Sequence, residues 1–125
     1  MINERELRLG NIINFPFIGS DVEVIGIPLP SEGKLRIQTK LNNNTFFELP
    51  AKYKPILLKE MWIIKLGFKS IQDGWYEYSN SNITFSWNIY DRQLRFLGEP
   101  FNIQYVNQLQ NLYYSLTGEE LEVKQ

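Results

Sequence analysis

The chain contains neither histidine nor cysteine, so it lacks the two side chains that most often carry catalysis and metal binding near neutral pH. Without thiols there can be no disulfide, no thiolate zinc site and no cysteine nucleophile. A serine or threonine nucleophile would need activation by a lysine or a carboxylate, and the sequence has no Gly-x-Ser-x-Gly motif. These residue types favour a protein that binds over one that catalyses.

Two other chemistries have little support. Paired carboxylates, as in glycosidases, would have to come from Asp21, Asp73 and Asp91, and aspartates in predicted turns usually stabilise the turn itself. The glycines form neither a Gly-x-Gly-x-x-Gly nor a Walker pattern, and there is no Asp-x-Asp pair for magnesium. We therefore expect no catalytic residue, no cofactor and no metal.

Aromatic residues interleaved with cations are the strongest pattern for a ligand site. Such residues can stack bases and hold phosphates, as they do in proteins that bind single-stranded nucleic acid. The alternative is that the aromatic rings form the core of a sheet. The candidates for nucleotide stacking and phosphate contact are Trp75, Tyr76, Tyr78, Tyr90, Arg92 and Arg95.

The overall charge does not favour a polyanionic partner. With 13 basic and 14 acidic residues the net charge is −1, which gives no long-range field for nucleic acid or an anionic membrane. Apolar residues make up 43% of the 125 residues, enough for one packed domain. There is no signal-like N-terminus and no apolar run near the ~20 residues that span a bilayer, so we expect a cytoplasmic protein.

The first fifty residues have the pattern of short strands. Polar and apolar residues alternate at 21–24, 34–38 and 45–49, apolar residues recur over 7–15, and a turn is indicated at 42–44. Four or five short strands at this spacing predict a small curled sheet or an SH3-like barrel.

A short buried helix is predicted at 58–66, where apolar residues recur at helical spacing. Gly67 can take the left-handed position after the helix, and Phe68 can then fold back onto Ile63 in a Schellman-type stop. An antiparallel meander should follow, with a hairpin turn at Asp73-Gly74 and strands at 75–78, 83–89 and 93–97. We expect Gly98 to Pro100 to break the last of these strands.

Residues 105–118, YVNQLQNLYYSLTG, predict an amphipathic helix that contains no charged residue and ends at Gly118. Its apolar arc should cover the sheet. Its polar arc has two interpretations: the amides face solvent or neighbouring loops of the same fold, or they form an interface, since amides and tyrosine lose less on desolvation than charged groups. The interface candidates are Asn107, Gln108, Asn111 and Tyr114.

Three blocks, ELRLGNIINF, PILLKEMWIIKLGF and YVNQLQNLYYSLTGEEL, are spread over the whole chain. They resemble the LRxGN opening, the PIPLTEEWLLKLGF-like middle and the YVHQLQNLYFALTGEEL-like tail of a family of small uncharacterised proteins of Bacteroidales bacteria and their phages. The resemblance implies a phage or mobile-element origin and brings no established activity with it. Asn107 stands where many relatives have His, which argues against a catalytic role there. Lys59 stands where relatives have a capping Thr, so the middle helix should begin without a side-chain cap.

The sequence as a whole predicts a single α+β domain over 1–125. Its parts are a strand-rich, SH3-like or curled region (1–50) and a region with a short buried helix, an antiparallel meander and a C-terminal helix packed on the sheet (55–125). The expected function is that of a non-enzymatic binding protein that contacts a host or phage protein stoichiometrically in the host cytoplasm, for example as a modulator of host defence. One alternative is a binder of nucleotides or single-stranded nucleic acid through the aromatic meander. Another is a structural or self-assembling phage component.

Overall fold

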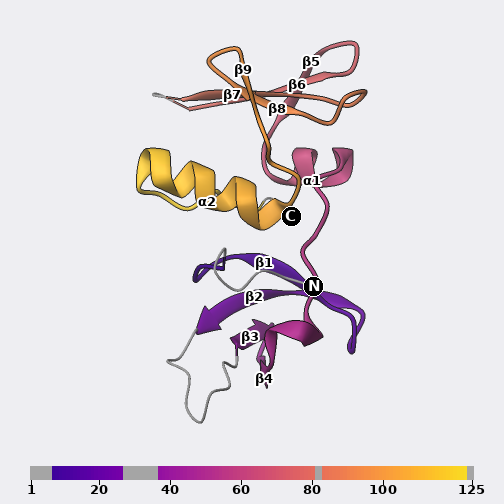
Figure 1. The fold of residues 1–125 in the computed structure, drawn as a ribbon, viewed down its shortest axis with the longest axis vertical. Helices are drawn as coiled ribbons and strands as arrows, with labels where there is room; N and C mark the ends of the chain where they lie inside the picture. Colours follow the sequence, from indigo (N-terminus) through magenta and orange to yellow (C-terminus); the bar gives the residue numbers. More distant parts are fainter. Residues whose placement is uncertain (1–6, 27–36, 81–82, 124–125) are drawn as a thin grey trace. The chain divides into compact units, whose positions relative to one another are not determined.

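The computed structural model describes residues 7–26, 37–80 and 83–123 (Figure 1). They form two compact units, each described here by itself. The first unit comprises the described residues of Met1–Ile56 together with Tyr105–Glu120, and the second comprises those of Leu57–Gln104 and Leu121–Gln125. The two antiparallel sheets and their helices confirm the predicted α+β class.

The sheet of the first unit has four antiparallel strands in the order β1-β2-β3-β4. Strands β1, β2 and β3 alternate buried and less buried residues, as the sequence predicted, whereas β4 alternates exposed and partly buried ones; residues 34–36 of the expected strand 34–38 lie outside the described residues. Asp21 lies in β2, which agrees with the predicted strand at 21–24 and not with a turn, and it accepts a hydrogen bond from Asn14. The strands are β1 (Ile12–Phe15), β2 (Ser20–Gly26), β3 (Ile37–Leu41) and β4 (Asn44–Glu48).

After β4 the chain makes one turn of 3-10 helix (Pro50–Lys52) and returns to β1. There Asn14 and Lys54 exchange two backbone hydrogen bonds of 2.9 Å. Tyr53 is fully buried, and its hydroxyl lies 3.0 Å from the Thr39 hydroxyl, so the two buried polar groups satisfy each other. Burial raises the pKa of Tyr53. The core of this unit consists of Leu7, Ile13, Phe15, Val22, Val24, Ile37 and Tyr53.

The helix of the first unit is α2 (Val106–Thr117), which begins after Tyr105 and ends at Gly118 in the left-handed region, with φ 75°. Its buried face includes Val106, Leu109 and Tyr113, from the predicted apolar arc. The sequence interpretation grouped this helix with the meander. In the structure it groups with β1–β4, and the backbone N–H of Val106 donates to Ile56 O at 2.8 Å.

The second unit contains α1 (Glu60–Lys65) and a five-stranded antiparallel meander in the order β5-β6-β7-β8-β9. The predicted Schellman stop is confirmed: Gly67 has φ 96°, the Phe68 N–H donates to Ile63 O at 3.1 Å, and the Gly67 N–H donates to Ile64 O at 3.0 Å. Lys59 provides no side-chain cap, also as predicted. The strands are β5 (Lys69–Gln72), β6 (Trp75–Ser79), β7 (Thr84–Asn88), β8 (Leu94–Phe96) and β9 (Glu99–Phe101).

Strand β9 was not predicted, because Gly98 to Pro100 was interpreted as a break. Leu97 and Gly98 instead form a two-residue turn in which both have positive φ, and Phe96 pairs with Glu99. Pro100 is tolerated because β9 is an edge strand of this sheet. No helix in the described part of the chain is long and apolar enough to cross a membrane.

Candidate functional site

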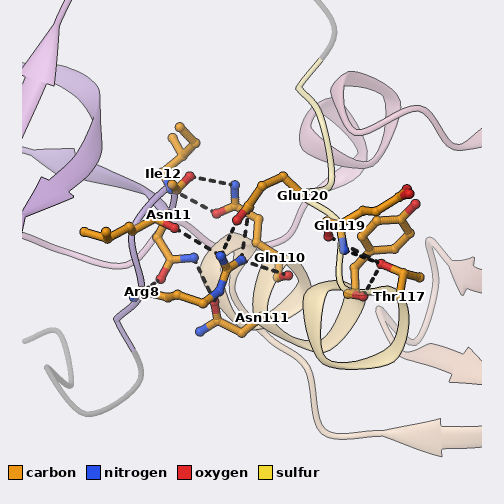
Figure 2. Close-up of polar contacts among 11 residues, drawn as sticks. Arg8, Asn11, Ile12, Gln110, Asn111, Thr117, Glu119 and Glu120 are labelled. Carbon is orange, nitrogen blue, oxygen red and sulfur yellow. Dashed lines mark hydrogen bonds and ion pairs between the residues drawn. The ribbon is translucent and has the colours of Figure 1, made fainter.

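The polar arc of α2 is occupied by the first unit's own N-terminal segment, residues 8–12 (Figure 2). Gln110 is buried, and its side-chain oxygen accepts from the Ile12 N–H at 2.9 Å while its side-chain nitrogen donates to Gly10 O at 3.2 Å. An amide can both donate and accept, so one side chain satisfies two backbone groups beside β1.

Arg8 completes this contact. Its Nε donates to Asn111 Oδ1 at 3.1 Å, and the same oxygen accepts from Asn11 Nδ2 at 2.8 Å. The guanidinium forms an ion pair with Glu120, where Nη2 lies 3.1 Å from Oε2, and its carbon lies 4.2 Å from the centre of the Tyr114 ring. We call Arg8, Gly10–Ile12, Gln110, Asn111 and Glu120 the α2 clasp.

The four predicted interface residues therefore have different environments. Asn111 belongs to the α2 clasp, and Gln108 accepts from the Tyr105 N–H at 3.2 Å at the start of the helix. Asn107 is buried, and its Oδ1 has no hydrogen-bond partner within the part of the chain that the structure describes. Tyr114 is 42% exposed beneath Arg8. The contact of Asn111 is the one expected if an amide of the polar arc bonds to a neighbouring loop of the same fold.

Of the six stacking candidates in the second unit, four lie on the two faces of its sheet and two lie in the turn after β7. Paired residues of neighbouring strands share a face, so Tyr76 and Tyr78 lie with Trp87 and Phe85. This is the core face, where Tyr76 contacts Trp87 at 6.1 Å between ring centres and Phe85 is fully buried. Tyr78 contacts the buried Phe68 at 5.5 Å.

Trp75 and Arg95 lie on the opposite face, where their partners are Asn88 and Ser86. The Arg95 guanidinium covers the Trp75 ring at 5.0 Å and forms an ion pair with Asp91 at 2.5 Å. That hydrogen bond lowers the pKa of Asp91. Because Arg95 occupies the Trp75 face, the nucleotide hypothesis would require this cluster to open, and it stays a prediction.

The two remaining candidates, Tyr90 and Arg92, lie in the turn after β7. Asn88 is buried, and its Oδ1 accepts from the N–H groups of Tyr90 at 2.8 Å and Asp91 at 3.3 Å. Tyr90 is exposed, and its hydroxyl donates to Asp73 at 3.3 Å; the Asp73 charge raises the pKa of Tyr90. Arg92 donates its N–H to Asn88 O at 2.7 Å and has φ 54°.

The same turn forms one wall of a cavity of about 580 Å³ within the second unit, in the range typical of ligand sites. The other wall follows β9, where the Leu58 N–H donates to Gln104 O at 2.9 Å. Apolar side chains alternate with amides and one ion-paired carboxylate, so the cavity can contact both apolar and polar groups. We call it the 91–104 cavity; its lining consists of Leu57, Leu58, Asp91, Arg92, Gln93 and residues 100–104.

Arg92 lies in the left-handed region at this cavity, which costs an L-residue other than glycine or asparagine about 1–2 kcal/mol. Such strain is found preferentially at functional sites. The sequence predicted Arg92 as a phosphate contact next to aromatic rings. It gave no indication of the cavity, because the wall at 100–104 depends on the unpredicted strand β9.

Two further features bear on chemistry. Within the described residues, no three acidic side chains gather closely enough to hold a metal ion. Ser31 and Lys34 have the Ser-x-x-Lys spacing that some hydrolases use, and both lie outside the described residues.

Comparisons with protein-family models, with curated proteins and with solved structures returned no match for this chain.

Proposed function

We propose that this chain is a non-enzymatic binding protein that holds a segment of a protein partner in the 91–104 cavity. The observation that carries the proposal is a ligand-sized cavity in the second unit, lined by both apolar side chains and amides. In the polar arc of α2, the other candidate surface, Gln110 and Asn111 are already used by the α2 clasp. A stoichiometric contact through the cavity is thus better supported than one through the helix.

The proposal is tested by blocking the cavity. Ile103 lines it and is partly buried, so Ile103→Glu should place a charge in the site and reduce partner capture about tenfold or more. The wild-type protein and the variant would be immobilised, and proteins retained from a host-cell lysate would be quantified by mass spectrometry. A matched control is Ile71→Glu, the same change at an exposed position on β5 of the same unit.

The wild type and Ile71→Glu should retain the same partner at equal levels, with circular dichroism confirming that all three proteins are folded. Equal capture by Ile103→Glu would refute the assignment to the cavity. A hydrolytic turnover that disappears in Ser31→Ala would refute the non-enzymatic part.

A further inference from the structure

The 91–104 cavity has one uncompensated charge. Both oxygens of Asp91 are engaged, one by Arg95 at 2.5 Å and the other by the Gln93 N–H at 2.9 Å. Arg92 is exposed, and its guanidinium makes no hydrogen bond or ion pair with the residues that the structure describes. Since Asp91 is neutralised by Arg95, the lining offers a single positive charge to a ligand.

Apolar surface lies on the same lining as that charge. Leu57 is 48% exposed, and Phe101 and Ile103 are partly buried. The side-chain amides of Gln93 and Asn102 also make no hydrogen bond within residues 7–26, 37–80 and 83–123, so both can pair with a peptide group. The cavity therefore combines one cation, an apolar wall and free amides.

We infer that the 91–104 cavity binds the C-terminal end of a partner polypeptide, with the terminal carboxylate on Arg92 and an apolar last side chain against Leu57, Phe101 and Ile103. This inference rests on the proposed function. A guanidinium fits a carboxylate through paired hydrogen bonds, and a C-terminal residue carries its carboxylate and its side chain on one carbon atom. A phosphate brings a charge nearer to −2, which one free cation matches less well.

The test compares peptides that differ only at the end. A pool of short peptides, randomised at every position but a final Leu, would be labelled at the N-terminus and prepared as the free acid and as the C-terminal amide. Fluorescence anisotropy should show the acid pool binding about tenfold more tightly than the amide pool. Replacing the final Leu by Gly should also weaken binding.

Arg92→Asn removes the charge with a residue that tolerates positive φ, so the fold should be retained. This variant should bind acid and amide pools equally, whereas Lys69→Asn, at an exposed position on β5, should behave as the wild type. Equal binding of acid and amide by the wild type would overturn the inference, as would an unchanged preference in Arg92→Asn. Displacement of the peptides by hexanoate at the same concentration would overturn it too, in favour of a small organic acid.

The two proposals fail separately. If the wild type binds the acid and amide pools equally but Ile103→Glu still loses the captured partner, only the C-terminal inference is wrong. If Ile103→Glu keeps the partner, the binding function assigned to the cavity is itself wrong.

Discussion

Amide side chains suit the contact between α2 and residues 8–12 better than charged ones. Gln110 is buried and meets one backbone N–H and one backbone C=O, a pair that neither a carboxylate nor an ammonium group can satisfy. A charged group in the same place would also have to lose its hydration. The absence of charge at position 110 follows from what this side chain contacts.

Replacing Gln110 by Met keeps the length of the side chain and removes both hydrogen bonds. The Ile12 N–H and Gly10 O would each lose a partner, and each unsatisfied group costs about 1–3 kcal/mol. We expect urea denaturation to show the free energy of unfolding reduced by about 2–4 kcal/mol. Gln72→Met, at an exposed position on β5, is the control and should change it by less than about 0.5 kcal/mol. A loss as small as that of the control would mean that Gln110 is not needed for stability.

The sequence predicted the two-faced character of α2 but could not identify its partner. Local spacing defines the helix and its arcs, since it involves residues three and four apart. Asn111 and Asn11 are separated by 100 positions, and Arg8 and Glu120 by 112. No pattern within residues 8–12 or within 105–120 indicates that these two segments are in contact.

Among the elements, those that depend on local rules were predicted well. The end of α1 needs only Gly67 and the return of Phe68, and both are visible in sequence. The β8–β9 hairpin was missed because its turn is Leu97-Gly98. Turns of this kind require positive φ at both positions and usually contain Asn-Gly, whereas Leu is rare at such φ values. The pairing of β8 with β9 therefore stabilises a turn conformation that Leu97 does not favour on its own.

Leu97→Asn should relieve this strain. Leu97 is 84% exposed, so little packing is lost, and Asn adopts φ near 55° more readily than Leu. We expect the second unit to be stabilised by about 1 kcal/mol, measured as a higher midpoint in thermal denaturation. Leu97→Val is the matched comparison and should lower the midpoint, because β-branched residues are poorly tolerated at positive φ. A midpoint for Asn no higher than that for Val would contradict the turn geometry.

At the level of the whole molecule, the second unit is largely an insertion in the first. The chain leaves the first unit after Ile56 and re-enters it at Tyr105. The Val106 N–H donates to Ile56 O at 2.8 Å within the first unit, and the Leu58 N–H donates to Gln104 O at 2.9 Å within the second. In each unit, a backbone hydrogen bond therefore joins the two positions at which the chain passes to the other unit. Inserted segments are tolerated where the ends of the insertion lie close together in this way.

This arrangement predicts that the first unit folds without the insertion. Met1–Ile56 would be joined through a short glycine linker to Tyr105–Glu120, which keeps all residues of the α2 clasp. Circular dichroism should show cooperative thermal unfolding, at a lower midpoint than the full chain because a smaller unit buries a smaller fraction of its surface. The same shortened chain with Leu109→Asp, a charge at a fully buried position of α2, is the control for lost packing and should show no cooperative transition. If the shortened chain melts like this control, β1–β4 and α2 depend on residues 57–104 for stability, and the insertion arrangement does not describe how the protein folds.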